Sequence, residues 1–280
     1  MRYRYYYFDR RKNEVAEFLN DNKIKYDVID YGGDDVWLRF SIYSSMANAD
    51  YCTEELKKMN RKAIDVFAEY TAKEYSEAKL LWMYPYNFFV DVLNVEESIR
   101  YACSWMSRSG WEVGNHPEQI CDYVIHKVPS TKKTVAFHTN DTGSSDLYAD
   151  YRIKQLVEEY QLKGFKFRNV YLKNGVCCDD FFQVEAPCII KEECMEFGYG
   201  EKVHRCPVCD RKHYYLGNAI QLHLDLSKIE EESDLYITEG IFGDGHPGPY
   251  YIISQKLYRL LKEKKLAGKL TFRPIADVSK

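Results

Sequence analysis

The sequence predicts an α+β fold, with mixed or antiparallel sheets and helices packed against them. Three observations lead to this prediction. Several short runs alternate apolar and polar residues, as half-buried strands do. Between these runs, apolar residues recur at three- and four-residue steps, as in amphipathic helices. A helix followed by glycine and a strand occurs twice, with a cysteine-rich, zinc-knuckle-like insert between the two copies. A chain of 280 residues is long enough to bury a sizeable core.

The first forty-odd residues predict a strand, a helix and a hairpin. Residues 3–8 are typical of a strand, and Asp9 is a candidate N-cap for a helix that runs to about Asn20. Residues 24–29 and 36–43 alternate in polarity on either side of a Gly-Gly-Asp-Asp turn. That arrangement predicts a β-hairpin.

The middle of the chain is less regular. Apolar residues at helical spacing predict a helix over residues 53–75, and Asn94 is a candidate cap for another helix over residues 94–107. Between them, the aromatic stretch 80–90 predicts strands that are interrupted at Pro85. Residues 109–133 show no clear pattern.

An internal echo organises the second half. Residues 151–164 and 255–268 each form an amphipathic pattern that ends in glycine, and a strand-like segment ending in arginine follows each copy. Gly164 and Gly268 are the expected C-terminal caps. Residues 15–29 form a looser third version without the glycine. The repeated unit predicts a helix laid back across a sheet.

These patterns suggest two regions. Residues 1–133 form an N-terminal α+β region, and residues 134–280 form a C-terminal α+β region with a cysteine-rich insert at about 177–215. Strands are expected at 218–226 and 234–241. The acidic run Glu230–Glu231–Glu232 precedes the second of these strands, and we expect it to be a solvated face that is able to meet a basic partner.

Composition narrows the class of protein. The formal net charge of −4 lacks the basic excess of a nucleic-acid binder, so no nucleic-acid partner is expected. No apolar run is long enough for a membrane span, and the N-terminus shows no secretion signal. Nine cysteines, an odd number, are typical of free, buried or metal-bound thiols in a reducing cytoplasm. Cys52, Cys103 and Cys121 lie among apolar residues and are expected to be core thiols.

The segment with the most specific chemistry is Cys206-Pro207-Val208-Cys209. Two cysteines two residues apart form a knuckle that is able to bind one zinc ion, but a complete structural site needs four ligands. The best candidates for the missing pair are Cys194, twelve residues before Cys206, and His213, four residues after Cys209. Cys177, Cys178, Cys188 and His204 remain alternatives. A redox pair is disfavoured because strand-like sequence, not a helix, follows the motif. The zinc would be structural.

The C-terminal half also resembles known families. The stretches CPVCDRKHYY, SDLYITEGIFG and YYIISQKLYRLLKEKKLAGKLTFRPI are similar to the double-CxxCG motif proteins and to related bacterial immunity proteins encoded beside polymorphic toxins. The match includes Ser254 after an apolar strand, Gly268 after a helix, and a final Phe272-Arg273-Pro274. Only one of the two Cys-x-x-Cys motifs is present, and Asp210 replaces the glycine of the family pattern.

The resemblance implies a non-enzymatic, zinc-containing α+β protein that neutralises a toxin by direct binding. A broad face of tyrosine, tryptophan and acidic residues would then contact the partner. The alternative is an enzyme whose site is assembled from dispersed residues, such as His204, His213 and His246 with nearby carboxylates. No nucleophile and base pairing stands out in the sequence, and the oligomeric state is not predicted.

Overall fold

A computed structural model describes most of the chain, and it divides into two compact units. One comprises Met1–Glu77 with Asn218–Gln221, and the other comprises Ala78–Gly217 with Leu222–Lys280. Residue 133, the predicted boundary, lies outside the described residues. The described ranges are 2–8, 14–30, 36–43, 45–59, 65–84, 89–106, 112–129, 137–140, 146–196, 202–206, 208, 212–215, 222–242, 248–268 and 270–279. Both units combine helices with antiparallel or mixed sheets, so the α+β prediction is confirmed.

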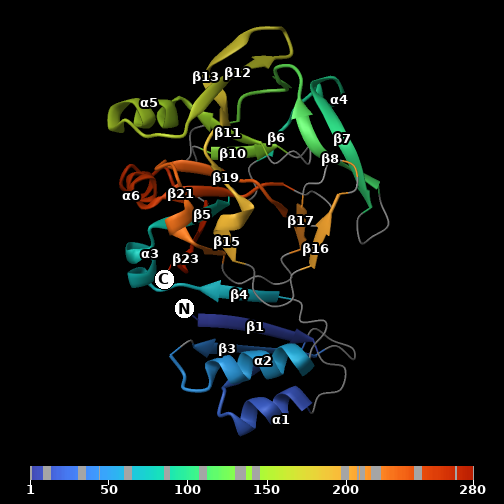
Figure 1. Ribbon diagram of the computed structural model, residues 1–280, viewed down its shortest axis with the longest axis vertical. Helices are drawn as coiled ribbons and strands as arrows, with labels where there is room; N and C mark the ends of the chain where they lie inside the picture. The colour runs from blue at the N-terminus through green and yellow to red at the C-terminus, as the bar shows by residue number, and fades with distance from the viewer. Residues whose placement is uncertain are drawn as a thin grey trace. The chain divides into compact units, whose positions relative to one another are not determined.

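The first unit contains a four-stranded antiparallel sheet with the strand order β2-β3-β1-β4 (Figure 1). Its elements in chain order are β1 (Arg2–Phe8), α1 (Glu14–Asp21), β2 (Tyr26–Asp30), β3 (Val36–Tyr43), α2 (Ala49–Met59), β4 (Asp65–Glu69) and α3 (Ala72–Glu77). The predicted first strand, helix and hairpin are confirmed. The proposed cap, Asp9, lies outside the described residues.

One face of this sheet is covered by α1 and α2. Leu38, Phe40 and Ile42 alternate along β3 and pack in one core cluster with residues of both helices. From α1 and α2 the cluster includes Val15, Phe18, Leu19, Ala49, Cys52 and Leu56. The intervening β3 residues Arg39 and Tyr43 are exposed on the opposite face. The predicted core position of Cys52 is confirmed.

The helix predicted over residues 53–75 is wrong in its second half. The helix α2 ends at Met59, residues 65–69 form strand β4, and α3 then begins at Ala72. The segment containing Val66 and Phe67 suits a strand as well as a helix, because β-branched and aromatic side chains favour pleated surfaces. Antiparallel pairing with β1 decides between the two, and this pairing spans some sixty residues of sequence.

The second unit contains two larger sheets. The first has the order β6-β10-β11-β13-β12-β9, and the second has the order β14-β19-β21-β5-β22. Strands of the first are β6 (Phe89–Val90), β10 (Phe137–Asn140), β11 (Leu147–Asp150), β13 (Cys177–Glu185), β12 (Lys166–Leu172) and β9 (Val124–Ile125). Strands of the second are β14 (Ile189–Ile190), β19 (Leu235–Thr238), β21 (Tyr251–Ser254), β5 (Leu80–Tyr84) and β22 (Thr271–Pro274).

Three smaller sheets complete this unit. They are the hairpin of β7 (Ile99–Met106) and β8 (Glu112–Gln119), the set β15 (Met195–Glu196), β18 (His223–Leu224) and β23 (Ala276–Asp277), and the set β16 (Lys202–Arg205), β17 (Lys212–Tyr215) and β20 (Ile241–Phe242). Its helices are α4 (Val95–Ser98), α5 (Tyr151–Tyr160) and α6 (Gln255–Glu263), with the 3₁₀ turns η1 (Glu192–Cys194) and η2 (Leu226–Lys228).

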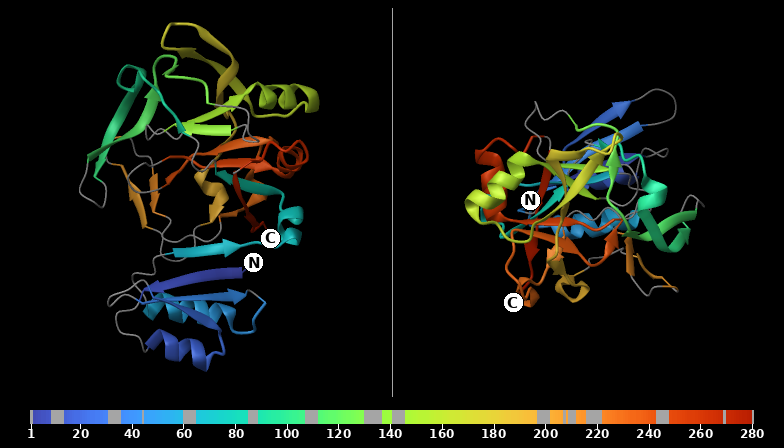
Figure 2. Two further views of the ribbon diagram at one scale, coloured as in Figure 1. Left: turned by 180° about the vertical axis from the view of Figure 1, so that it is seen from behind. Right: turned by 90° about the horizontal axis from the view of Figure 1, so that it is seen from above.

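The internal echo corresponds to one recurring topology. In β11-α5-β12 the two strands flank β13, and in β21-α6-β22 they flank β5. Each flanking strand is antiparallel to the central strand, so the flanking pair is mutually parallel (Figures 1 and 2). The looser third version has the same arrangement, with β1 and β2 on either side of β3. The predicted repeat is therefore a split βαβ unit.

The glycines of the echo do not act as the predicted helix caps. The C-cap of α5 is Gln161, whose φ of 50° is left-handed, and the C-cap of α6 is Lys264, followed by Lys265 at φ 58°. Gly164 instead lies against another segment, since a Cβ there would be 2.3 Å from the carbonyl oxygen of Leu235. At the other end, Asp150 and Ser254 are true N-caps of α5 and α6.

The predicted helix over residues 94–107 is also wrong. Only Val95–Ser98 is helical, and Ile99–Met106 forms β7. The Asn94 side chain does not cap this turn. It donates to the carbonyl of Asp122 (3.0 Å) and accepts from the amide of Val124 (2.7 Å), so it fixes a neighbouring loop instead. Among the described residues, no helix is long and apolar enough to cross a membrane.

Candidate functional site

The Cys-x-x-Cys motif lies at the end of a hairpin. Strands β16 and β17 pair antiparallel, with Arg205 opposite Lys212, so residues 206–211 connect them. Cys206 is buried at 3% exposure, whereas Val208 is 70% exposed. Cys209 lies outside the described residues. A buried cysteine before an exposed turn residue is compatible with a zinc knuckle.

The other two predicted ligands differ in their surroundings. His213 lies in β17 opposite His204, and the structure does not describe the side chain of either. Cys194 belongs to η1 and is 2% exposed. Its thiol donates to the carbonyl oxygen of Lys228 over 3.5 Å. Burial, followed by the neighbouring Glu193 carboxylate, raises the pKa of this thiol above its ordinary value. As it stands, Cys194 is therefore a protonated thiol that links η1 to η2.

One alternative ligand, His204, lies in β16 just before the knuckle, and the other three lie in core clusters or in β13. Cys178 and Cys188 are buried in two different core clusters, and Cys177 is half-buried in β13. Within the described part of the chain, no group of three or more histidine, cysteine, aspartate or glutamate side chains is placed to hold a metal ion. The histidine proposed for an enzyme site, His246, lies outside the described residues.

A surface that the sequence shows only in part is strongly acidic. We call it the acidic surface and define it by charged residues at the start of η1, in the segment from η2 to residue 232, and directly after β19. Its members are Lys191, Glu192, Glu193, Lys228, Glu230, Glu231, Glu232 and Glu239. Six carboxylates against two ammonium groups leave a charge of −4, as large as that of the entire chain. Five of the six glutamates are exposed, and Glu192 is half-buried.

Backbone contacts hold the two segments of the acidic surface together. The amide of Glu192 donates to the Glu239 carboxylate (3.0 Å), and the amide of Glu239 donates to the carbonyl of Ile190 (3.0 Å). The Lys228 ammonium group donates to the carbonyl of Glu193 (3.2 Å). On the far side, the Tyr236 hydroxyl donates to the carbonyl of Glu231 (3.1 Å). The surface is thus built on fixed backbone.

An aromatic ladder lies under one end of this surface. Trp82 stacks on Tyr250 at 4.1 Å, Tyr250 on Phe242 at 4.1 Å, and Phe242 on Tyr214 at 5.3 Å. Burial, and then the charge of Glu192, raises the pKa of Tyr214 above its ordinary value. Arg273 covers the other end, 4.9 Å from the Trp82 ring centroid. Tyr214 and Phe242 are almost fully buried, so the ladder is mainly core packing.

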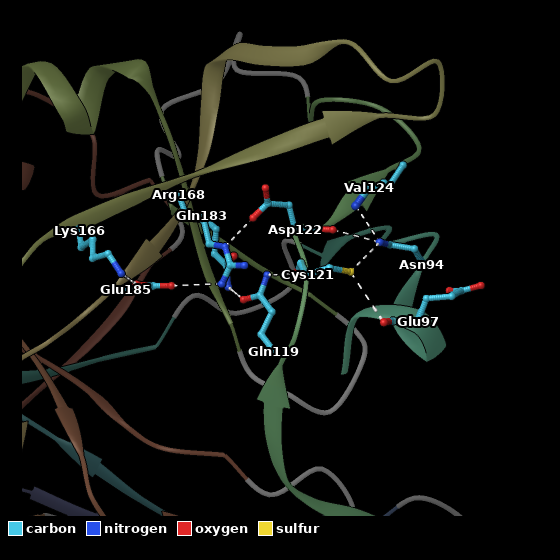
Figure 3. Close-up of polar contacts among 10 residues, drawn as sticks. All are labelled: Asn94, Glu97, Gln119, Cys121, Asp122, Val124, Lys166, Arg168, Gln183 and Glu185. Atoms are coloured by element: carbon cyan, nitrogen blue, oxygen red, sulfur yellow. Dashed lines mark hydrogen bonds and ion pairs between the residues drawn. The ribbon is translucent and has the colours of Figure 1, made fainter. Parts of the chain in front are cut away.

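A third polar group of residues links the loop at 119–124 to strands β12 and β13 (Figure 3). The Arg168 guanidinium donates to Asp122 (2.6 Å) and lies 3.6 Å from Glu185. The Gln183 amide donates to Gln119 (2.7 Å), and Gln119 donates to the carbonyl of Cys121 (2.9 Å). Lys166 also pairs with Glu185 (2.5 Å), so two cations face two carboxylates, which indicates a structural brace. Figure 3 shows the Cys121 sulfur directed toward Asn94 and Glu97; its thiol is 3.7 Å from the Glu97 carbonyl.

Sequence analysis finds some members of these sites and misses others. The exposed run 230–232 is predicted, whereas its neighbours at 192–193 and 239 are brought to it only by the parallel pairing of β14 with β19. The expected core position of Cys121 is wrong, because this cysteine is exposed in the loop of the brace.

Comparison with protein-family models and with curated proteins finds no match to this chain. The resemblance to the double-CxxCG and immunity families therefore rests on the sequence motifs alone.

Proposed function

We propose that this chain is a non-enzymatic cytoplasmic binding protein of the immunity type, which neutralises a toxin by direct binding to a basic surface. The observation that carries the proposal is the acidic surface. It concentrates a charge of −4 on two chain segments, and its carboxylates are exposed to a partner. The resemblance of the C-terminal half to immunity proteins supports the same reading.

The construction of the acidic surface suits protein recognition. Like charges repel one another by an amount that depends on their spacing, so a partner that brings positive charge relieves this repulsion. Complementary charge also speeds encounter and excludes wrong partners. Because backbone hydrogen bonds already hold η1 against the end of β19, little ordering is needed on binding.

An apolar contact lies at the edge of the same surface. Ile189 is 58% exposed on β14, which is the edge strand of its sheet, and it precedes the charged residues Lys191 and Glu192. Protein interfaces combine a central apolar contact with a polar rim. We propose that Ile189 supplies part of this contact and that the neighbouring glutamates form part of its polar rim.

We further propose that the cysteine-rich hairpin carries one structural zinc ion. The ligands would be Cys206, Cys209, Cys194 and His213. In this proposal the metal holds the loop of residues 206–211 and takes no part in catalysis. The buried position of Cys206 at the base of that loop supports its role as a ligand.

The function is tested by affinity capture from the organism that encodes the chain, followed by co-expression of each captured protein with it. The variant Glu230→Gln/Glu231→Gln/Glu232→Gln removes three negative charges from the acidic surface. A matched variant, Glu14→Gln/Glu17→Gln/Asp50→Asn, removes three charges from the exposed sides of α1 and α2.

The proposal is supported by a captured protein that meets three conditions. It inhibits growth when expressed alone, co-expression of this chain restores growth, and only the first variant fails to capture it. The proposal is wrong if no captured protein is toxic, or if the two variants reduce capture of the toxic partner equally. The ionic-strength dependence of binding gives a second readout, because a charge-dominated contact weakens as salt rises.

A further inference from the structure

The hairpin of β7 and β8 joins none of the larger sheets in the described part of the chain. Its strands, of eight residues each, form a two-stranded sheet, which Figures 1 and 2 show at the margin of the second unit. A hairpin of only two strands is marginally stable in water, whereas a third strand or more stabilises it. Each strand has one edge that pairs within the hairpin and one edge that faces away from it. The outward edges therefore decide whether the hairpin accepts a further strand.

Hydrogen bonding at the base of the hairpin shows which backbone groups face outward. The amide of Ile120 donates to the carbonyl of Ser98 (2.9 Å), so these opposite residues form a hydrogen-bonded pair. Hydrogen-bonded and non-hydrogen-bonded pairs alternate along two antiparallel strands. In the register of β7 with β8, the pair of Tyr101 with Pro117 is therefore non-hydrogen-bonded, and the backbone groups of both residues point away from the partner strand. The amide of Ile99 agrees with this alternation, because it donates within α4 and not to β8.

The two outward edges differ in what they offer to another strand. Pro117 has no N–H to donate from the outward edge of β8, and proline at such a position is a usual protection of a strand edge. Strand β7 contains no proline, glycine or lysine, and the alternation directs the N–H and C=O groups of Tyr101 and Trp105 outward. Among the described strands, β7 pairs with β8 alone. The edge of β8 is thus blocked at Pro117, whereas that of β7 is open.

The charge of β7 favours a neutral partner strand. Arg100 is its single charged residue, and its guanidinium pairs with the Glu118 carboxylate of β8 (2.7 Å). Tyr101 is 41% exposed, and Ser104 is exposed as well. A copy of β7 meets the requirement for neutrality. In an antiparallel pair of copies related by a two-fold axis, Arg100 does not lie opposite itself unless the axis passes through that residue, so the pairing brings no like charges together.

We propose that β7 pairs with β7 of a second copy of this chain. The two hairpins then form one antiparallel sheet in the order β8-β7-β7-β8, with a two-fold axis between the central strands. Each copy contributes its open edge, and Pro117 lies on both outer edges of the combined sheet. The proline thereby limits the assembly to two copies, which accounts for the difference between the two edges. This inference does not rest on the acidic surface or on the proposed function.

The test measures the mass of the full chain by sedimentation equilibrium and by light scattering at about 1–200 μM protein. One pair of eight-residue strands makes a small interface, so we expect a monomer–dimer equilibrium in the micromolar range. A chain that stays monomeric at every concentration overturns the proposal. An assembly of the unaltered chain that grows beyond two copies also overturns it.

Paired charge variants locate the contact on β7. Tyr101→Lys/Ser104→Lys and Tyr101→Glu/Ser104→Glu each place like charges on both central strands, so each variant alone should lose about tenfold or more in dimer affinity. An equimolar mixture of the two variants should dimerise again, because opposite charges then meet across the two strands. The matched control is Tyr51→Lys, which changes an exposed tyrosine of α2 and should leave the equilibrium unchanged.

The mixture distinguishes pairing through β7 from any other mode of association. If both variants dimerise as the unaltered chain does, or if their mixture stays monomeric, the contact lies elsewhere and the proposal is overturned. An equal loss in Tyr51→Lys also counts against it. The altered positions are exposed, and circular dichroism confirms that each variant retains its fold.

Pro117 provides an independent test. Pro117→Thr restores an outward N–H on β8 and removes no hydrogen bond to β7, because the pair with Tyr101 is non-hydrogen-bonded. We expect species larger than a dimer at the highest protein concentrations, since the second edge becomes available. Asn115→Thr is the control, because it alters an outward position of the same edge that already has an N–H. If Pro117→Thr forms nothing larger than a dimer, the blocked edge does not limit the assembly and the proposed arrangement is wrong.

Discussion

Gly164 shows how one residue joins two parts of the second unit. Its φ is 83°, and a Cβ at this position would be 2.0 Å from the Ser233 hydroxyl and 2.3 Å from the Leu235 carbonyl oxygen. The repeat pattern led us to expect a helix cap, because glycine after an amphipathic run is the usual signal. The glycine is needed instead because the turn after α5 packs directly on the backbone that enters β19.

We therefore predict that Gly164→Ala lowers the free energy of unfolding by several kcal/mol. The left-handed φ alone costs about 1–2 kcal/mol. The clash of the new Cβ with the Leu235 carbonyl oxygen adds a steric cost, because a backbone atom shifts less readily than the end of a side chain. Gly175→Ala is the matched control, since Gly175 has a φ of 79° but nothing within 4 Å of its would-be Cβ. Urea unfolding compares the two. Equal losses would contradict the close approach at Gly164.

A second prediction concerns His138, which is 3% exposed in β10 and lies edge-on to the Phe181 ring at 5.6 Å. Burial lowers the pKa of His138 to about 4; Asp150 raises it, and Arg152 lowers it further. The unfolded chain takes up the proton below about pH 6.5, whereas the folded chain does not do so until about pH 4. The contribution of neutral His138 to the free energy of unfolding is therefore complete above pH 6.5 and is lost as the pH falls toward 4.

The loss attributable to His138 should be about 3 kcal/mol, since one pKa unit corresponds to about 1.4 kcal/mol. His138→Phe and His138→Gln should each flatten the pH dependence of the free energy of unfolding between pH 6.5 and 4. His126→Gln, which replaces an exposed histidine, serves as the control. If the slope persists in both His138 variants, this histidine is not the group that takes up the proton.

At the scale of elements, Asp234 connects the two echo units of the second unit. Its carboxylate accepts from the amide of Lys163 after α5 (3.0 Å) and from the hydroxyl of Ser254 (2.5 Å), which caps α6. The backbone of Asp234 also bonds to Lys163 and Ser254. Asp234 is 8% exposed, so water does not replace these bonds if the carboxylate is removed.

We predict that Asp234→Ala destabilises the chain by about 3 kcal/mol, because hydrogen bonds to a charged group contribute about 1.5–3 kcal/mol each and a buried cap donor loses its partner. Asp234→Asn keeps the shape and one acceptor oxygen, so its loss should be smaller. The neighbouring exposed residue Glu231 provides the control variant Glu231→Gln. Thermal and urea unfolding measure all three, and an Asp234→Ala loss no larger than that of Glu231→Gln would contradict the clamp.

Elements whose signals are local were predictable, and those that depend on distant pairing were not. The helices α1, α5 and α6 have strong apolar periodicity, and Asp150 and Ser254 cap the last two. The segments at 65–69 and 99–106 were predicted to be helical because the spacing of their apolar residues fits both the helix period and the strand period. Their strands exist because β1 and β8 pair with them. A short stretch of sequence does not show which distant strand will pair with it.

At the scale of the whole molecule, charge is unevenly distributed in a way that composition hides. The acidic surface alone carries a charge of −4, equal to the net charge of the chain, so the remaining residues sum to zero. The run at 230–232 was visible in the sequence, but its extension to 192–193 requires the parallel pairing of β14 and β19. Composition thus predicted the sign of the charge on the candidate interface but not where on the molecule that charge lies.

The proposed zinc ion is a property of the whole molecule, since its ligands come from two separated segments. We predict that protein purified without added metal contains about one zinc per chain. Cys206→Ser should lose the metal and melt at a lower temperature, because a structural site stabilises the fold it closes. Mass spectrometry of the digested protein measures the metal, and Cys121→Ser, which replaces an exposed cysteine, is the control.

Cys194 decides the composition of that site. Its thiol already donates to the Lys228 carbonyl, and serine preserves such a donor. If Cys194 is a zinc ligand, Cys194→Ser loses the metal as Cys206→Ser does, because a hydroxyl is a poor zinc ligand at neutral pH. If Cys194→Ser keeps its zinc, the thiol serves only to hold η1 against η2, and the fourth ligand must be sought elsewhere. A wild-type chain without zinc would contradict the metal site as a whole and leave Cys206 as a buried core thiol.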